Sequence, residues 1–193
     1  VKIKITIMIK NLNLFKNKTV IITGHTGFKG SWLSIWLNHL GAKVIGISNN
    51  VPTKPSNFIL NNLKSKIKDV KADIRDEKKI FTLIKKYKPT IVINTAAYTN
   101  VEGAEDNKIT ANRINADAVR ALAKSCNKFD IPIFHLSTDY VFDGKKEDYY
   151  IETDQTNPLN SYGHSKLSGE LAIKEETEKF IILRTSWVFS KIG

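Results

Sequence analysis

The fold of this chain is decided by one early stretch, Thr19-Val20-Ile21-Ile22-Thr23-Gly24-His25-Thr26-Gly27-Phe28-Lys29-Gly30. The five residues before the first glycine are mostly β-branched and apolar, which predicts a buried strand over residues 19–23. The glycines that follow predict a turn leading into a helix. A helix is expected there because apolar residues recur on one face, at Leu33, Trp36, Leu37 and Leu40.

Short apolar runs alternate with helical patterns along the rest of the chain. Beyond the first strand, we expect strands over residues 43–48, 68–72, 90–94, 131–137 and 180–184. Helical stripes precede the fourth and fifth strands, at Ile80, Leu83, Ile84 and Tyr87 and at Ile114, Ala118, Ala121 and Leu122. Strands joined by helices form parallel sheets, so we predict an α/β protein with a Rossmann-type, doubly wound parallel sheet.

The predicted domain organisation is simple, with a single domain over residues 15–193. Residues 1–14 are expected to be an N-terminal extension, since Met8 opens the phrase that leads into the first strand. Loops are predicted at residues 51–57 and at residues 142–160, the second of which is long and polar. Loops of that length in compact domains tend to be functional.

The composition excludes several classes of protein. A hydrophobic fraction of 41% and a charged fraction of 25% are ordinary for a soluble globular protein. No apolar run approaches the roughly 20 residues needed to span a bilayer, so no membrane association is expected. The single cysteine, Cys126, excludes an internal disulfide and suits a reducing cytoplasm. It falls within a helical pattern and is predicted to be a packing residue.

The net charge of +11 raises the question of a nucleic-acid partner. The lysines are scattered along the chain, however, and do not form a patch interleaved with aromatic residues. We therefore expect a solvated surface that mildly favours anionic ligands, and no nucleic-acid binding.

The three glycines have the spacing of a phosphate-binding loop. Gly24 permits the tight turn, Gly27 lets the backbone approach a pyrophosphate, and Gly30 lets the helix pack closely on the strand. The free N–H groups at the helix start then meet the charge of the phosphates. In this context the motif predicts a bound nicotinamide dinucleotide, contacted by Gly24, Thr26, Gly27, Phe28, Lys29 and Gly30. His25 is expected to shape the backbone, since the reacting carbon should lie far from the pyrophosphate.

The choice between NAD and NADP stays open in the sequence. The second strand ends in Ser48, Asn49 and Asn50, without the acidic residue that selects NAD by holding the ribose hydroxyl. No arginine is adjacent to receive a 2′-phosphate, although Lys54 is near in sequence. The pattern favours NADP or use of both cofactors.

The glycine spacing resembles that of the extended short-chain dehydrogenase/reductase superfamily. In that superfamily the aspartate of a phrase like Ala72-Asp73-Ile74-Arg75 contacts the adenine, which implies Asp73 and Ile74 as cofactor-binding residues. The alternative role for Asp73 is a cap for the helix that follows.

A candidate catalytic pair lies in the stretch Tyr162-Gly163-His164-Ser165-Lys166, at the start of a helix with an apolar stripe at Leu167 and Leu171. Residues four apart on a helix lie one above the other, which brings the phenol and the ammonium together. A free tyrosine titrates near about 10, and a lysine cation beside Tyr162 is expected to lower that pKa. The pair can then donate a proton to a carbonyl oxygen while hydride arrives from the nicotinamide.

From about residue 90 to the end, the chain resembles the dTDP-4-dehydrorhamnose reductases. The matching phrases are residues 94–101 (NTAAYTNV), 137–144 (STDYVFDG), 158–166 (PLNSYGHSK) and 183–189 (LRTSWVF). The resemblance implies a catalytic triad of Thr138, Tyr162 and Lys166, with the cofactor beside Ala96, Ala97 and Tyr98. It implies contacts with a nucleotide-sugar substrate for Thr99, Val101, Asp139 and Trp187. An equally good alternative is that Trp187 packs in the hydrophobic core after the sixth strand.

The first part of the chain resembles a different family, the CDP-glucose 4,6-dehydratases. That resemblance is carried by residues 15–18 (FKNK), 24–33 (GHTGFKGSWL), 52–56 (PTKPS) and 73–76 (DIRD). The chain therefore reads as a hybrid joined near the fourth strand. Natural recombination, an in-frame deletion and an assembly artefact are all open as its origin.

The residue that follows Asp139 distinguishes a dehydratase from a reductase. Elimination by these dehydratases requires a glutamate or lysine there, whereas this chain has Tyr140 without an evident lysine partner. The resemblance therefore implies NAD(P)H-dependent reduction of the 4-keto group of a nucleotide-activated deoxysugar, as in dTDP-rhamnose and lipopolysaccharide biosynthesis. A sugar-nucleotide dehydratase and a non-catalytic NADP-binding regulatory subunit are the alternatives.

The length of the chain bears on the activity, because the reductases continue beyond the sixth strand into a C-terminal sugar-binding lobe. We expect that lobe to be largely missing, which leaves the cofactor site nearly complete and the sugar pocket half walled. No metal-ligand constellation is apparent. The expected location is the cytoplasm and the expected partner is the nucleotide sugar, with a homodimer left open.

Overall fold

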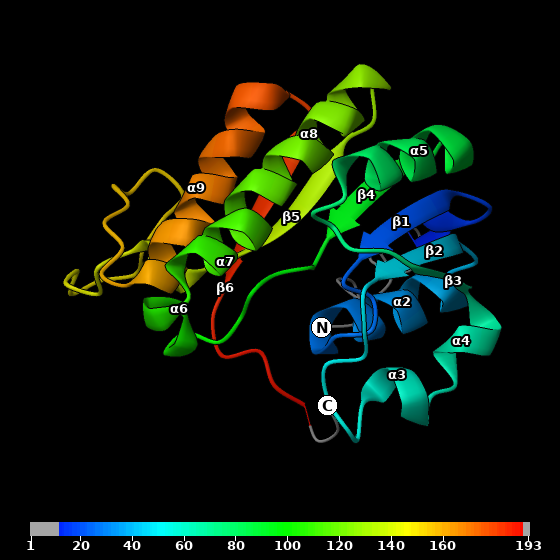
Figure 1. Cartoon of the computed structure of the whole chain (residues 1–193), viewed down its shortest axis with the longest axis horizontal. Helices are drawn as coiled ribbons and strands as arrows, with labels where there is room; N and C mark the ends of the chain where they lie inside the picture. The colour runs from blue at the N-terminus through cyan, green and yellow to red at the C-terminus, as the bar shows by residue number, and fades with distance from the viewer. Residues whose placement is uncertain (1–11, 191–193) are drawn as a thin grey trace, which may run out of the picture.

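The structure, a computed structural model, describes residues 12–190. Its centre is a six-stranded parallel sheet with the strand order β3-β2-β1-β4-β5-β6 (Figure 1). The strands are β1 (Thr19–Thr23), β2 (Lys43–Ser48), β3 (Lys68–Lys71), β4 (Ile91–Asn94), β5 (Ile133–Thr138) and β6 (Phe180–Thr185). This arrangement confirms the predicted α/β class and the doubly wound parallel sheet.

Helices cover both faces of the sheet (Figure 1). One face carries α2 (Phe28–His39), with the short α3 (Asn57–Leu60) and α4 (Leu63–Lys66) beside it. The other face carries α5 (Glu77–Tyr87), α8 (Ala118–Lys128) and α9 (Ser161–Glu176).

The connection from β4 to β5 contains additional short helical elements. These are α6 (Gly103–Asp106), α7 (Lys108–Asn112) and a π-helical turn, η2 (Arg113–Asp117), which runs directly into α8. Two 3₁₀ turns flank the sheet strands: η1 (Leu12–Phe15) precedes β1 and η3 (Asp139–Val141) follows β5.

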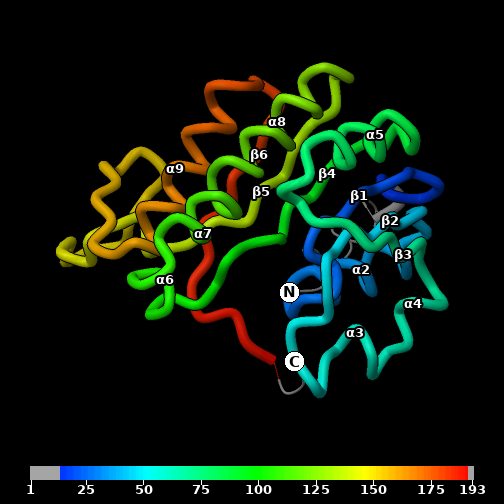
Figure 2. The backbone as a smooth tube through the Cα atoms, in the orientation of Figure 1, coloured from blue at the N-terminus to red at the C-terminus, as the bar shows by residue number. Residues whose placement is uncertain are grey.

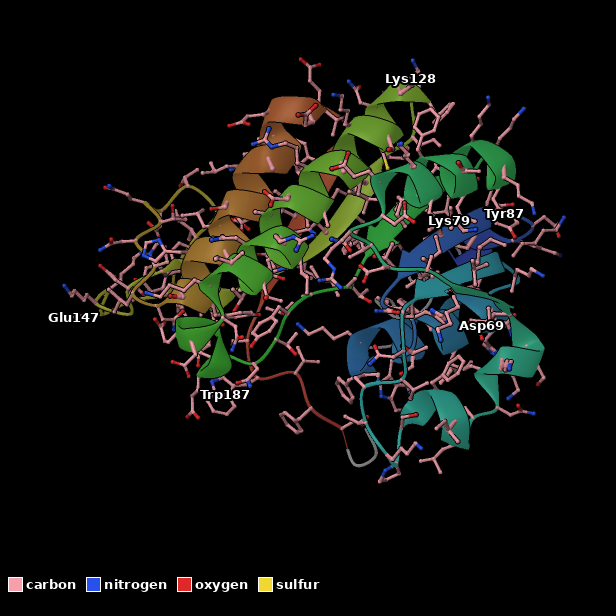
Figure 3. All side chains as sticks on the ribbon, viewed as in Figure 1. Asp69, Lys79, Tyr87, Lys128, Glu147 and Trp187 are labelled. Atoms are coloured by element: carbon pink, nitrogen blue, oxygen red, sulfur yellow. The ribbon has the colours of Figure 1, made fainter. Side chains whose placement is uncertain are left out.

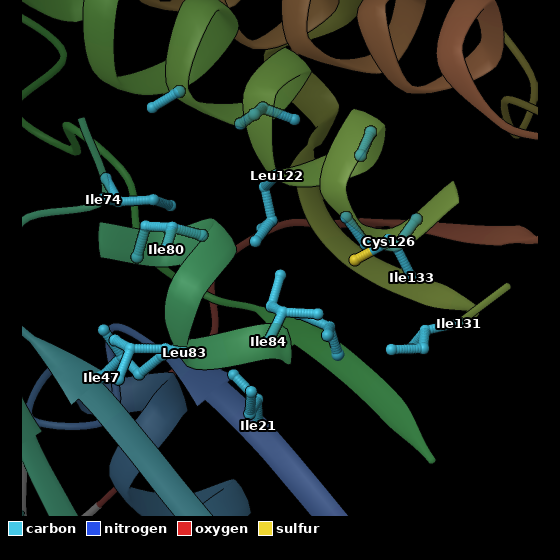
Figure 4. Packing of buried hydrophobic residues seen from close by; sticks show 14 of the residues in the cluster. Ile21, Ile47, Ile74, Ile80, Leu83, Ile84, Leu122, Cys126, Ile131 and Ile133 are labelled. Atoms are coloured by element: carbon cyan, nitrogen blue, oxygen red, sulfur yellow. The ribbon is translucent and has the colours of Figure 1, made fainter. Parts of the chain in front are cut away.

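The hydrophobic core is divided by the sheet into two clusters. The larger cluster packs α5 and α8 against the sheet and is seen from close by in Figure 4. Its central members include Ile21, Ile84, Val92, Leu122 and Ile133. Cys126 lies in it and is fully buried, and burial raises the pKa of its thiol to about 12, so its predicted packing role is confirmed. The smaller cluster lies under α2.

The predicted strands agree with the structure to within two residues at each end. The largest shift is at β5, which begins at Ile133 instead of residue 131. Pro132 has no N–H group to donate to the sheet, and Asp130 before it has a positive φ of 58°, so the chain is still turning there. The segment 142–160 contains no helix or strand, as predicted.

Two predicted apolar stripes are wrong in detail. In α2, Trp36 is 48% exposed, and the buried residues are Gly30, Ser31, Ser34 and Leu37. In α9, Leu171 is 48% exposed, whereas the buried side includes Ser165, Lys166, Gly169 and Glu170. Both helices approach their neighbours closely through small or hydrogen-bonded residues, and apolar periodicity does not report that kind of contact.

The strand order reverses between β1 and β4, which places a crevice at their carboxyl ends. The segment that follows β6 turns back past these strand ends toward the part of the chain around α3 (Figure 2). The predicted extension over residues 1–14 falls mainly on residues 1–11, which lie outside the described residues. Within residues 12–190, no helix is long and apolar enough to cross a membrane.

The glycine loop brings α2 against β1 and β4. A Cβ atom at Gly30 would lie 2.3 Å from the carbonyl oxygen of Gly24 and 2.6 Å from Oγ1 of Thr95. Gly24 itself has a φ of +72°, and a Cβ there would lie 2.7 Å from the main-chain nitrogen of Ala96. The roles predicted for these two glycines, a close helix–strand approach and a tight turn, agree with this geometry.

We predict that Gly30→Ala destabilises the protein by about 1–3 kcal/mol, because the added methyl group must displace backbone atoms. Gly27→Ala is the matched control, since a Cβ there would meet only the Gly24 oxygen, at 3.3 Å. Urea unfolding followed by circular dichroism measures both. Equal stability losses in the two variants would contradict the packing argument.

Candidate active site

A cavity of 730 Å³ lies at the carboxyl ends of β1, β2, β4 and β5. Most of the predicted cofactor-binding residues line it together: Gly24, Thr26, Gly27, Phe28, Lys29, Gly30, Asp73, Ile74, Ala96, Ala97, Tyr162 and Lys166. The fold therefore gathers residues from the glycine loop, β3, β4 and α9 around one space. Tyr98 is the predicted cofactor residue that does not line it.

The glycine-loop side of the cavity fits a pyrophosphate. Gly27 is the N-cap of α2, and no described side chain caps this helix, so N–H groups of its first turn remain for an anion. The loop approaches its neighbours so closely at Gly24 and Gly30 that side chains there would meet backbone atoms. The open, positively polarised helix start matches the group that the sequence predicts.

His25, within the glycine loop, packs in the interior beside β3 and α3. Its ring is fully buried, stands edge-to-face on Phe58 at a centroid distance of 5.2 Å, and places Nε2 3.0 Å from Oδ1 of Asp69 on β3. Burial lowers the pKa of His25, and the Asp69 carboxylate opposes that shift. The predicted role of His25 as a residue that shapes the backbone agrees with this position.

The end of the cavity beside β2 contains an arginine that sequence analysis missed. Arg75 forms an ion pair with Asp73 at 2.6 Å, and Asn49 also donates to that carboxylate. The hydrogen bonds from Arg75 are the main reason that the pKa of Asp73 is lowered. Among the described residues, Arg75 is the only arginine that lines the cavity. The sequence signal that could have identified Arg75 is its position two residues after Asp73, the predicted cofactor-binding aspartate.

The alternative role for Asp73, as a helix cap, is wrong. The N-cap of α5 is Asp76, whose carboxylate accepts a hydrogen bond from the main-chain N–H of Lys79 at 3.0 Å. Asp73 instead turns toward Arg75 and lines the cavity. Its predicted contact with the adenine remains a prediction.

Lys29 extends from the start of α2 across to the last strand. Its Nζ donates to Oγ1 of Thr185 at 2.8 Å, at the carboxyl end of β6. Burial lowers the pKa of Lys29, and the nearby Asp139 carboxylate opposes that shift. A cation therefore lies between the glycine loop and the predicted catalytic residues.

Two of the predicted catalytic residues, Thr138 and Tyr162, meet where β5 and α9 come together. Thr138 is the last residue of β5, and its hydroxyl is a hydrogen-bond partner of the Tyr162 phenol. It also donates to Oδ1 of Asp139 at 3.1 Å. The ring of Tyr140 stands edge-to-face on the Tyr162 ring at 5.7 Å. The phenol is thereby held between β5 and the loop that follows it.

The predicted lowering of the Tyr162 pKa is wrong for this structure. Burial raises the pKa of Tyr162, and the negative charge of Asp139 adds to the increase, while the Thr138 hydrogen bond opposes it. The lysine does not act on the phenol because its Nζ points elsewhere, donating to the carbonyl oxygen of Leu136 at 2.8 Å. Tyr162 is therefore a protonated phenol at neutral pH.

Lys166 is almost fully buried, with 2% of its surface exposed. Burial lowers its pKa from an ordinary value of 10.5 to about 7, the Lys29 ammonium contributes, and Glu170 opposes the shift. Besides Leu136, its Nζ approaches Nε2 of His135 at 3.2 Å. This buried lysine is the most strongly perturbed amine of the cavity, and perturbed groups cluster at functional sites.

A second residue that sequence analysis missed is Asn115, in the middle of the π-helical turn. It is fully buried, bonds both the N–H and the carbonyl of Tyr98, and donates to Oγ of Ser165 on α9. Tyr98 is thus fixed through its main chain. Single π-turns often occur at functional sites, and this one ties the loop after β4 to the helix that carries Tyr162.

The predicted substrate-binding residues do not all line the same cavity. Thr99 lines the 730 Å³ cavity, whereas Asp139 lines a second cavity of 510 Å³ together with Tyr140 and Arg184. Val101 lines neither. Trp187 projects from the segment after β6 (Figure 3) and is 87% exposed, so its alternative role as a core residue is wrong. No cluster suited to a metal ion occurs within residues 12–190.

The comparison with protein families agrees with this geometry. The family model described as the RmlD substrate binding domain matches residues 18–193, nearly the whole chain. The chain belongs to the RmlD family. The match extends across both sides of the predicted junction near the fourth strand, and it gives no support for a dehydratase origin of the first part of this RmlD family member.

Curated relatives of this RmlD family member are named dTDP-4-dehydrorhamnose reductase. The protein from Sinorhizobium fredii is 48% identical over 105 residues, which are 54% of this chain and 36% of the relative. The protein from Shigella flexneri is 41% identical over 125 residues, which are 65% and 42% of the two chains. The chain therefore spans about two fifths of the length of these relatives.

Solved structures extend the similarity over most of this RmlD chain. The dTDP-4-dehydrorhamnose reductase of Bacillus anthracis, solved in complex with NADP, has a TM-score of 0.77 and 32% identity, and covers 92% of this chain and 56% of its own. A hypothetical dTDP-4-dehydrorhamnose reductase from Sulfolobus tokodaii has a TM-score of 0.76 and 36% identity, with 91% and 58% covered. Both are similar in fold and in sequence.

We predict that Lys166→Met changes how stability depends on pH. The ammonium is disfavoured in the folded state, so the unfolded chain binds more protons between about pH 7 and 10.5, and the wild type gains stability as pH rises through that window. The free energy of unfolding of the variant, measured relative to the wild type, should therefore increase as the pH is lowered from 9 to 7. The expected increase is about 1.4 kcal/mol per pH unit.

Denaturant unfolding at pH 7 and pH 9 measures this difference. Lys174→Met, on an exposed part of the same helix, is the control and should change stability equally at both pH values. A constant offset for Lys166→Met would mean that the lysine has an ordinary pKa in the folded protein.

Proposed function

We propose that this chain carries the site for NAD(P)H-dependent reduction of the 4-keto group of a nucleotide-activated deoxysugar. The observation that carries the proposal is the convergence of Thr138, Tyr162 and Lys166 beside the cavity that the glycine loop opens into. Membership of the RmlD family and the names of the curated relatives support the same reaction.

The raised pKa of Tyr162 suits the reductive direction. Reduction of a ketone needs a proton donor at the carbonyl oxygen, and a phenol whose pKa is raised by burial is fully protonated at neutral pH. Thr138 hydrogen-bonds the phenol, which lines the cofactor cavity. A bound nicotinamide supplies the hydride. Lys166 lines the same cavity one helical turn along α9, and the negative phosphates of a bound dinucleotide would favour its ammonium form.

Cofactor selection is proposed to favour NADP. The end of β2 carries Asn49 and Asn50, which bring no negative charge to repel a 2′-phosphate, and Arg75 lies at the same end of the cavity. The Arg75 side chain bonds Asp73 through Nε and one terminal nitrogen, which leaves the other terminal nitrogen for a ligand. A guanidinium is well suited to phosphate recognition.

The sugar nucleotide is proposed to enter from the side of the second cavity. Asp139 and Tyr140 line that cavity and also adjoin Thr138 and Tyr162, so it meets the cofactor cavity at the predicted catalytic residues. Aromatic and arginine side chains are present there for a base and a diphosphate, with Phe142 stacked on Tyr150 and Arg184 over Phe142.

The direct test is to incubate the purified chain with NADPH or NADH and a dTDP-4-dehydro-6-deoxysugar. Oxidation of the reduced nicotinamide, followed by its near-ultraviolet absorbance, is the expected result. If the cofactor binds and absorbance never falls, even when the C-terminal part of a related reductase is supplied, the enzyme proposal fails. A non-catalytic binding subunit then becomes the better account.

We predict that Tyr162→Phe lowers turnover by about 10²–10⁴-fold, because it removes the proton donor. The affinity for NADPH should stay within about twofold, since the ring remains in place. Steady-state kinetics and a fluorescence binding titration measure the two quantities. Tyr140→Phe is the matched control for a neighbouring phenol and should retain most of the turnover. Loss of cofactor binding in Tyr162→Phe would assign the phenol a structural role.

We predict that Arg75→Ala weakens NADP binding by about tenfold or more, the value of one charged hydrogen bond. NAD binding should be unchanged, because NAD carries no 2′-phosphate. Calorimetric titration with each dinucleotide measures the ratio, and Arg120→Ala, which removes an exposed arginine of α8, is the control. Parallel losses for both dinucleotides would mean that Arg75 only supports Asp73.

A further inference from the structure

A continuous chain of buried polar groups runs across three strands of the sheet and ends at Lys166. Thr23 on β1 donates to Oδ1 of Asn94 on β4 at 2.5 Å, and Nδ2 of Asn94 lies 2.8 Å from Nδ1 of His135 on β5. On the far side of the imidazole, Nε2 lies 3.2 Å from Nζ of Lys166. All four residues are at least 98% buried.

The orientation of the Asn94 amide in this structure sets the direction of these hydrogen bonds. The oxygen of the Asn94 amide accepts from Thr23, so its NH₂ group faces His135 and donates to Nδ1. An imidazole nitrogen that accepts carries no hydrogen, so in a neutral ring the proton is on Nε2. That Nε2–H group points at Lys166, whose nitrogen can accept only as a neutral amine because an ammonium has no lone pair.

Burying these hydrogen-bonded polar groups costs desolvation free energy, which suggests that they have a role beyond packing. Polar side chains that are at least 98% buried must all be paired, and apolar residues of similar size would fill the same space at lower cost. Lys166 also lines the cofactor cavity and completes the chain by donating to the carbonyl oxygen of Leu136. The polar groups therefore connect the interior of the sheet to an amine that a ligand would meet.

We propose that His135, oriented by Asn94 and Thr23, is a positioning residue that holds Lys166 as a neutral amine in the cofactor-free protein, so that dinucleotide binding is accompanied by uptake of a proton. The proton comes from solvent and adds to the amine, and no other bond changes. The part that concerns the dinucleotide rests on the proposed function, whereas the state of the free protein does not.

The other charged groups around Lys166 have opposing effects on its protonation. Lys29 on α2 disfavours the ammonium and Glu170 on α9 favours it, but Glu170 is already paired with Arg184 on β6 at 2.7 Å. Burial lowers the pKa of His135 well below its ordinary value, so its ring remains neutral beside the lysine. A dinucleotide brings negative phosphates to a cavity lined by Lys29 and Lys166, which favours the ammonium.

The first experiment examines the free protein by nitrogen-15 and carbon-13 NMR. The His135 ring should show the tautomer with its proton on Nε2, and it should stay neutral from pH 6 to 9. The Nζ and Cε signals of Lys166, assigned by their absence in Lys166→Met, should titrate near pH 7. A ring protonated on Nδ1, or a lysine that is fully charged at pH 8.5, would overturn the proposal.

Variants test whether His135 causes the neutral state. In His135→Leu the titration midpoint of Lys166 should rise by about one pH unit, because the donor to the amine is lost. Thr23→Val, which frees the Asn94 amide to turn over, should shift the ring toward the Nδ1–H tautomer even if His135→Leu fails to fold. His39→Gln, on an exposed part of α2, is the control. An unchanged midpoint and an unchanged tautomer in folded variants would contradict the inference.

The second experiment measures proton uptake when NADP⁺ binds, by calorimetry at pH 8 in buffers of different ionisation enthalpy. The wild type should take up about one proton and Lys166→Met none. Binding without uptake would overturn the coupling to the ligand. If NADP⁺ does not bind, the proposed function fails, and the NMR measurements still decide whether His135 holds the lysine neutral.

Discussion

The close approach of the glycine loop to its own strand and to β4 is the constraint on which the site depends. No side chain fits at Gly30 because the Gly24 carbonyl lies beneath it, and Gly24 has a positive φ beside the main chain of Ala96. The start of α2 and the end of β4 are thereby drawn together where the strand order reverses. The uncapped helix start and the open crevice both follow from this contact.

The opposite wall of the cavity is held by polar groups. α9 is attached to the sheet through Lys166, which bonds the β5 main chain, and through Glu170, which is paired with Arg184 on β6. Asn115 attaches the same helix to the loop after β4. Because each of these groups would be costly to leave unpaired in the interior, the position of Tyr162 is fixed more narrowly than apolar packing alone would fix it.

Electrostatics at the site differ from those of the whole molecule. The net charge of +11 is spread over the surface, whereas the cavity lining combines Lys29, Arg75 and Lys166 with Asp73. Lys29 and Lys166 are at least partly buried and have lowered pKa values. The pKa of Lys166 is about 7, so its charge can respond to a bound anion. A dinucleotide therefore meets a cavity whose positive charge can increase when its phosphates arrive.

The sequence by itself determined the strands, the glycine loop and the spacing of Tyr162 and Lys166, because these depend on local periodicity and on backbone freedom at single residues. Only the tertiary structure decided which sides of α2 and α9 are buried, where Trp187 lies, and that the Tyr162 pKa is raised. It also decided the partners of Lys166, since Thr23, Asn94 and His135 lie on three strands far apart in the sequence. Burial and charge depend on such distant neighbours, and no local pattern records them.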